Sequence, residues 1–164
     1  MAIECPDDRT TVIVPNDREG LSDERAVILK ALDDPIGGQP LRELVRADTK
    51  ICLLFTDITR ATPNHRLIPW LLEYLDFIPK ENITLLNQLG THRPNSRAEL
   101  EKILTKAVVN EYRVLNAEPE NREAHIQLGI THDDTPALIN RHAVEADLRI
   151  MTGFIEPHFF AGFS

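Results

Sequence analysis

Three short polar clusters carry side chains that can do acid–base chemistry on a small anion. Asp57 and Arg60 lie in DITR, His92 lies in GTHR, and His158 directly follows Pro157 near the last residue. Histidines titrate near neutral pH, so a pair of them can exchange protons with a substrate from two faces without a large pKa shift. An arginine fork matches the two oxygens of a carboxylate. These residue types can do acid–base chemistry or bind a small anion.

Each cluster also has a purely structural interpretation. Asp57 and Arg60 could form a local ion pair or cap the next helix, because aspartate is common in turns. His92 could simply hydrogen-bond its own loop. The stretch THDDTP, with His132 and Asp133, could supply metal ligands, although adjacent acids before Thr-Pro are more typical of a solvated turn. A shared site is favoured because all three main clusters directly follow predicted strands.

Those strands are predicted from nearly continuous apolar runs, which are typical of strands covered on both faces of a parallel sheet. The runs include KICLLF and ITLLNQL, and weaker ones are HIQLGI and LRIMTG. Ligands bind beyond the carboxyl ends of the strands in such sheets. We therefore expect the polar clusters to meet at one edge of a single, largely parallel sheet with strands near 50–56, 83–89, 125–130 and 148–152.

Helical patterns alternate with these runs. Thr62 and Pro63 read as the N-cap and first position of one helix, in which Pro69 predicts either a kink or a second start. Ser96 and Glu99 have the spacing of a capping box ahead of another helix. Strands alternating with helices predict a mostly parallel sheet with helices on both faces, a Rossmann-like three-layer α/β sandwich.

The whole chain, residues 1–164, is predicted to form a single α/β domain. Ahead of the first buried strand, TTVIVP is expected to form an edge strand and SDERAVILKAL a helix. Together they would add an arm or an extra layer to the sheet.

Composition excludes several classes of protein. The formal charge of −8, from 26 acidic and 18 basic residues, argues against a nucleic-acid partner. The apolar runs are too short to span a membrane, which predicts no membrane partner. Two cysteines are too few for a disulfide framework and favour a reducing cytoplasm.

The last residues concentrate aromatic side chains. Phe159, Phe160 and Phe163 fall within the final six positions, where a genuine C-terminus seldom places three large apolar groups. We expect these rings to be exposed to solvent or buried against another copy in a homo-oligomer. The tail therefore predicts that the chain is an N-terminal fragment of a longer protein.

The motifs DITRATPNHR, GTHRP and EADLRIMTGFIEPHFFAGFS, in this order, resemble the N-terminal domain of the nickel-dependent lactate racemase family. The resemblance runs from about Asp34 to the last residue. It implies a racemase or epimerase of small 2-hydroxy acids that uses a nickel-pincer nucleotide, in which a pyridinium ring accepts a hydride from the substrate.

The resemblance also implies roles for individual residues. His92 and His158 would alternate as base and acid on the substrate hydroxyl, and Arg60 would bind the carboxylate. Asp57 would support the site or the cofactor, while Gly162 and Ser164 would begin the loop that holds the cofactor phosphate. No residue of this chain is assigned as a metal ligand.

Other features of the family are absent from these residues. The lysine that attaches the cofactor and the C-terminal domain that closes the cleft would both follow Ser164. We therefore expect the fragment alone to lack cofactor and activity. Two alternatives stay open, namely a non-catalytic anion- or nucleotide-binding module, and a metal hydrolase that uses His92, His132, Asp133 and His158.

Overall fold

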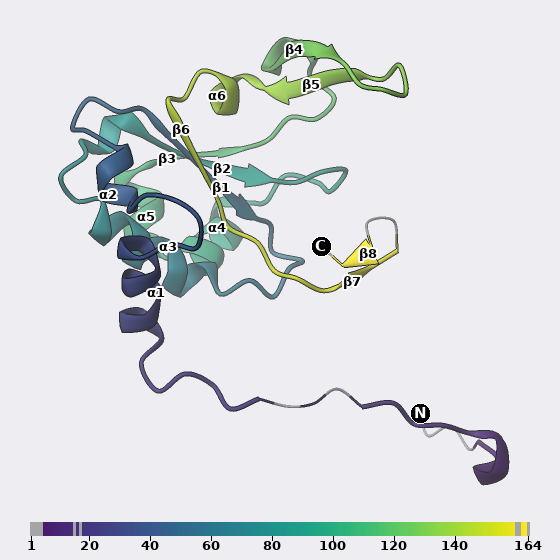
Figure 1. The fold of residues 1–164 in the computed structure, drawn as a ribbon. Helices are drawn as coiled ribbons and strands as arrows, with labels where there is room; N and C mark the ends of the chain where they lie inside the picture. The colour runs from purple at the N-terminus through teal and green to yellow at the C-terminus, as the bar shows by residue number, and fades with distance from the viewer. Residues whose placement is uncertain (1–4, 15, 17, 160–161, 164) are drawn as a thin grey trace.

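A four-stranded parallel sheet forms the centre of the computed structural model, which describes residues 5–14, 16, 18–159 and 162–163 (Figure 1). The strand order is β3-β2-β1-β6, and every neighbouring pair is parallel. The strands are β1 (Ile51–Thr56), β2 (Ile83–Gln88), β3 (Arg113–Asn116) and β6 (Leu148–Met151). The α/β class with a mostly parallel sheet is therefore confirmed.

Alternate residues of β1 enter two different apolar cores, which explains its continuous apolar run. Ile51, Leu53 and Phe55 pack into a large cluster with the helices on one face of the sheet. Cys52 on the opposite face packs in a smaller cluster that includes Ala143. Both faces are covered, but the second by a much thinner layer.

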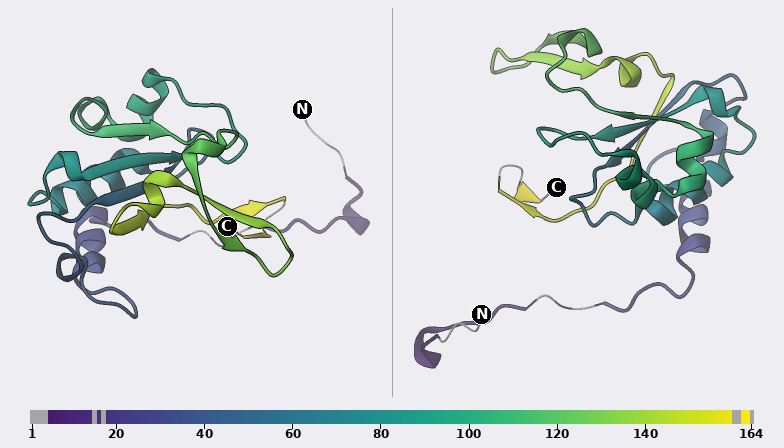
Figure 2. Two further views of the ribbon diagram at one scale, coloured as in Figure 1. Left: turned by 90° about the horizontal axis from the view of Figure 1, so that it is seen from above. Right: turned by 180° about the vertical axis from the view of Figure 1, so that it is seen from behind.

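Most helices lie on the first face (Figures 1 and 2). They are α1 (Glu24–Asp33), α2 (Leu41–Leu44), α3 (Asn64–Tyr74), α4 (Arg97–Leu104) and α5 (Lys106–Glu111). The short α6 (Arg141–Val144) supplies Ala143 to the second face. Among the described residues, three 3₁₀ turns complete the helical elements: η1 (Asp7–Arg9), η2 (Lys80–Asn82) and η3 (Arg122–Ala124). None of the helices in the described part of the chain is long and apolar enough to cross a membrane.

The predicted helix starts are close to those observed. α1 confirms the helix expected in SDERAVILKAL, and Asp23 caps it by accepting a hydrogen bond from the Ala26 N–H. α3 begins one residue later than expected, with Pro63 as a cap that makes no side-chain hydrogen bond. It continues through Pro69 without a second start.

Ser96 and Glu99 form the predicted capping box at the start of α4. Ser96→Ala is expected to lower the free energy of unfolding by about 1 kcal/mol, because the Glu99 N–H loses its acceptor. Urea denaturation would measure this change. The exposed Ser22, which caps no helix, provides the control Ser22→Ala, for which a change within about 0.5 kcal/mol is expected. Equal losses in both variants would contradict this role for the cap.

Two strand predictions are wrong. His125–Ile130 forms β4, which pairs antiparallel with β5 (Pro136–Asn140) in a separate hairpin, and Arg113–Asn116 takes the sheet edge instead. Only the first two residues of β4 are even half-buried, so its apolar content does not reflect a place inside the sheet. Likewise, no strand forms at 10–14 within the described residues, where Val12, Ile13 and Val14 are exposed.

The described end of the chain is a small antiparallel pair, β7 (Pro157–His158) with β8 (Gly162–Phe163). Gly162 has φ +72°, a left-handed conformation that favours glycine. Phe159 and Phe163 are exposed, as predicted for the tail, with relative accessibilities of 102% and 80%. Phe160 lies outside the described residues.

Candidate functional site

The polar clusters meet at the carboxyl ends of β1, β2 and β6, where they line a cavity of about 540 Å³. Asp57 and Arg60 follow β1, His92 follows β2, and His158 is reached through the segment after β6. The lining residues are Thr56, Asp57, Arg60, Gln88, Leu89, Gly90, Thr91, His92, Thr152, Gly153, Phe154 and His158. The structure thus brings together the four side chains proposed for chemistry.

The remaining predicted residues lie apart from this lining. Gly162 pairs with His158 across the β7–β8 ladder but does not line the cavity. Ser164 lies outside the described residues. The phosphate-loop role of these two residues therefore stays a prediction.

Asp57 is a buried carboxylate with both oxygens engaged. Its Oδ1 accepts hydrogen bonds from the Thr59 backbone N–H at 2.7 Å and from the Thr59 hydroxyl at 2.6 Å. Its Oδ2 lies 2.5 Å from Nδ1 of His92. Burial raises the pKa of Asp57, but the hydrogen bonds from Thr59 and His92 outweigh it, and the net shift is downward. Asp57 is therefore ionised and acts as an acceptor.

The carboxylate fixes the tautomer of His92. An ionised Asp57 can only accept, so Nδ1 of His92 must carry a proton and donate it to Oδ2. In the neutral imidazole, Nε2 is then left with a free lone pair, as a general base requires. The His92 side chain is 42% exposed and that of Asp57 only 3%. The imidazole of the pair is therefore accessible to a ligand, whereas the carboxylate that supports it is shielded from solvent.

A tight turn places His92 next to this carboxylate. β2 ends at Gln88, Gly90 adopts φ +55°, and the His92 N–H donates to the Leu89 carbonyl at 2.9 Å. The conformation of Gly90 is one that a side chain rarely adopts, which explains why glycine begins the turn. The turn brings the His92 ring back over the end of β1.

Arg60 has a different partner from the one that the local ion-pair interpretation assumed. Its Nε lies 3.4 Å from Oε1 of Glu156, two residues before His158. Both side chains are about one-third exposed. Arg60 also lines an adjoining cavity of about 350 Å³ together with Arg66 and Lys102. Arg66 is itself paired with Glu24, and Asp57 also lines this cavity, so the basic side chains there lie beside carboxylates.

The four residues of the metal-hydrolase alternative do not all come together, since only His92 and His158 line the same cavity. His132 and Asp133 lie in the turn between β4 and β5, where Asp133 accepts a hydrogen bond from Thr131 and neither residue lines the cavity of His92. Across the ranges that the structure describes, no group of three His, Cys, Asp or Glu residues could hold a metal ion. This geometry gives the hydrolase alternative no support.

Asp57 should make stability depend on pH in the acid range. Its pKa is lowered on folding, so its stabilising contribution is present above the ordinary value of 3.8 and is lost as the pH falls through the lower folded value. The difference in unfolding free energy between the wild type and Asp57→Asn is therefore expected to shrink as the pH falls from 6 toward 3. Urea unfolding across this range measures it, with Asp8→Asn, an exposed aspartate, as control. A difference that stays constant with pH would refute the assignment.

Sequence reasoning missed several residues at this site. Glu156 immediately precedes Pro157 in the motif EPH. An acidic residue at this position could have indicated a partner for Arg60. Asn87 and Asn95 are fully or almost fully buried, at 0% and 6% exposure. An asparagine at the end of an apolar strand was the signal for Asn87.

These features define an α/β domain with an Asp–His pair and a lined cavity at the carboxyl edge of its parallel sheet. The chain matches the lactate racemase N-terminal domain family over residues 1–164. It is 33% identical to a lactate racemase of Lactiplantibacillus plantarum, covering 100% of this chain and 42% of that protein. It is 31% identical to a lactate racemase of Thermoanaerobacterium thermosaccharolyticum, covering 100% of this chain and 39% of that protein. The chain therefore belongs to the lactate racemase N-terminal domain family.

Solved structures agree with this assignment. The lactate racemase apoprotein from T. thermosaccharolyticum superposes with a TM-score of 0.78 at 32% identity, covering 85% of this chain and 34% of that one. A Thermotoga maritima protein superposes with a TM-score of 0.70 at 24% identity, covering 85% of this chain and 36% of that one, and so supports the fold alone. The chain spans about two-fifths of the length of the curated relatives it matches.

Proposed function

We propose that this chain is the N-terminal part of a cytoplasmic 2-hydroxy-acid racemase or epimerase, with His92 and His158 as its acid–base pair. The observation that carries the proposal is that both histidines and Arg60 line one cavity, although they follow three different strands. The family's named relatives are lactate racemases, which makes lactate the first substrate to test.

The two histidines are proposed to move the hydroxyl proton on opposite faces of the substrate. His92 can accept a proton at Nε2 because Asp57 keeps the other ring nitrogen protonated and stabilises the imidazolium that forms. His158 would return a proton from the other face. Inversion of a stereocentre needs one such group on each face, and exchanging the two roles gives the reverse reaction.

Arg60 is proposed to bind the substrate carboxylate. Its link to Glu156 uses Nε, which leaves the terminal nitrogens of the guanidinium for a planar anion. Glu156 holds the guanidinium from the segment that also carries His158. The same pairing thus connects carboxylate recognition to the second base.

A nickel-pincer nucleotide would bring its metal already bound, so the residues of this chain would not need to supply a donor set for a metal ion. Asp57, a carboxylate that lines the cavity, is engaged by three hydrogen bonds with Thr59 and His92. A nickel-pincer nucleotide, when bound, would supply reversible acceptance of the hydride from the substrate carbon. Asp57 would support it indirectly through His92, and Gly162 with Ser164 would hold its phosphate.

A direct test is to incubate the full-length protein separately with D- and L-lactate and to follow both enantiomers by chiral chromatography. Interconversion in both directions supports the proposal. Binding of lactate without interconversion would instead favour the non-catalytic anion-binding module. Neither binding nor interconversion, with lactate or with other 2-hydroxy acids, would refute the proposal.

Residues 1–164 alone are expected to turn over neither enantiomer. The attachment lysine and the closing domain implied by the resemblance are not among these residues, so the substrate would stay in contact with water and without cofactor. The same chromatographic assay on the purified 164-residue chain measures this, with the full-length protein as positive control. Steady turnover by the isolated chain would show that a second domain is not needed.

A further inference from the structure

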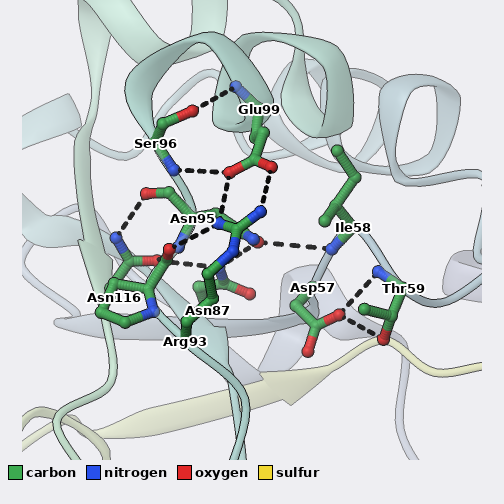
Figure 3. A network of polar contacts seen from close by, with 10 residues as sticks. Asp57, Ile58, Thr59, Asn87, Arg93, Asn95, Ser96, Glu99 and Asn116 are labelled. Carbon is green, nitrogen blue, oxygen red and sulfur yellow. Dashed lines mark hydrogen bonds and ion pairs between the residues drawn. The ribbon is translucent and has the colours of Figure 1, made fainter.

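A buried network of three asparagines joins the loops that carry Asp57 and His92 (Figure 3). Asn87 comes from β2, Asn116 from β3, and Asn95 from the loop that follows His92. Asn87 is fully buried and Asn95 nearly so, at 6% exposure. Burying polar side chains in such a place costs free energy unless their donors and acceptors are hydrogen-bonded. The partners of these asparagines therefore indicate what the network does.

Asn95 lies at the centre of this network. Its side-chain oxygen accepts hydrogen bonds from the Ile58 backbone N–H at 3.3 Å and from the Asn87 amide at 2.9 Å. Its own backbone N–H and carbonyl both bond to the side-chain amide of Asn116, at 3.2 and 2.9 Å. Asn95 is therefore fixed to two strands through Asn87 and Asn116, and it is attached directly to the residue after Asp57.

The second amide hydrogen of Asn87 completes the arrangement by donating to the Asn116 side-chain oxygen at 2.9 Å. These hydrogen bonds are consistent with one orientation of each amide, although the buried Asn87 side-chain oxygen has no hydrogen-bond partner among the described residues. Beyond Asn95, the capping box and the paired hydrogen bonds from Arg93 to Glu99 anchor the same loop to α4. The loop is thus anchored at several points on the C-terminal side of His92.

We propose that Asn95 is a positioning residue that sets the separation of Asp57 and His92 by bonding to both of their loops. The expected effect of Asn95 on kcat rests on the proposed racemase function. The expected effect on the geometry of the Asp57–His92 pair does not. Asn95 itself does not line the cavity that contains the two histidines. It acts through the geometry of the pair, and misplacement of a catalytic group by about 1 Å can cost roughly 100-fold in rate.

The test compares Asn95→Ala with Asn95→Asp in the full-length protein. Alanine removes the acceptor of both hydrogen bonds, whereas aspartate keeps an oxygen in that place. NMR of protein labelled with ¹⁵N-histidine reports the Nδ1 proton shared by His92 and Asp57, assigned by its disappearance in His92→Ala. We expect this signal to persist in Asn95→Asp and to be lost or shifted in Asn95→Ala.

Kinetics give the second readout. Asn95→Ala is expected to lower kcat for lactate by about 10- to 100-fold with little change in KM, because Arg60 is not part of the network. Asn110→Ala, which removes a surface asparagine bonded to Arg97, and Ile103→Val, which destabilises the core, should leave kcat and the proton signal unchanged. A purely structural role for Asn95 would make Ile103→Val and Asn95→Ala behave alike.

Two outcomes would overturn the proposal. One is a folded Asn95→Ala protein that keeps both the Nδ1 proton signal and a wild-type kcat. The second applies if Asn95→Ala does not fold. Asn116→Asp then removes the donor to the Asn95 carbonyl but keeps the side-chain oxygen that accepts from Asn95 and Asn87. An unchanged Nδ1 proton signal in this variant would overturn the proposal. Absence of lactate turnover by the wild type would count against the proposed function alone, since the NMR comparison would still decide the role of Asn95.

Discussion

His92→Ala and His158→Ala are each expected to lower the rate of racemisation in the full-length protein by about 10²- to 10⁴-fold, the usual contribution of a general acid or base. Both histidines line the cavity, and each is proposed to serve one face of the substrate. Loss of either group leaves one face without a proton carrier. The inversion then stops, although the fold should stay intact.

The equilibrium between the two enantiomers sets a further condition on the rates of these variants. Two enantiomers have an equilibrium constant of 1, so kcat/KM must remain equal in the two directions for any variant. A one-sided loss would therefore indicate a competing reaction. Initial rates from D- and L-lactate by chiral chromatography provide the measurement, and His132→Ala in the turn between β4 and β5 is the matched control. Near-normal rates for either active-site variant would end the two-base mechanism.

Arg60→Ala is expected to reduce kcat/KM by about 100-fold or more, since a hydrogen bond to a charged group contributes roughly 1.5–3 kcal/mol and the proposed contact includes two. Arg60→Lys should recover little of this loss, because an ammonium group cannot reproduce the planar fork. Steady-state kinetics with lactate measure both variants.

Arg66→Ala is the matched control for Arg60. Arg66 pairs with Glu24 and lines the adjoining cavity rather than the one that contains the histidines. Its loss should change kcat/KM much less. If Arg60→Ala and Arg66→Ala gave equal reductions, a general effect of positive charge would replace specific recognition of the carboxylate.

The strands of the central sheet were easiest to predict where burial on both faces left a mark in the sequence, although the half-exposed edge strand β6 was predicted as well. KICLLF has such a mark, and its residues indeed alternate between two cores. HIQLGI is only half apolar and lies in a mostly exposed hairpin, whereas Arg113–Asn116, which is also half apolar, occupies the sheet edge. Strand propensity is local, whereas the place of a strand depends on which partner covers it.

For the candidate site, the sequence predicted which residues lie together but not which side chains pair. The rule that ligands bind beyond the carboxyl ends of parallel strands was enough to bring Asp57, Arg60, His92 and His158 to one cavity. The contact between Asp57 and His92 joins residues 35 positions apart, and that between Arg60 and Glu156 depends on the path of the last segment. Such pairings depend on side-chain positions in three dimensions, which no spacing along the chain encodes.

The strand that leads to His158 is also the last strand of the central sheet in chain order. β6 joins β1 through contacts such as that between the Lys50 N–H and Asp147, which are 97 positions apart. During synthesis β1, β2 and β3 leave the ribosome first, and one edge of β1 has no strand beside it until residues 148–151 have emerged. A bare apolar strand edge is the kind of surface on which chains aggregate. The nascent polypeptide is therefore expected to be prone to aggregation until β6 pairs with β1, and the segment after this same strand brings His158, the proposed second base, to the cavity.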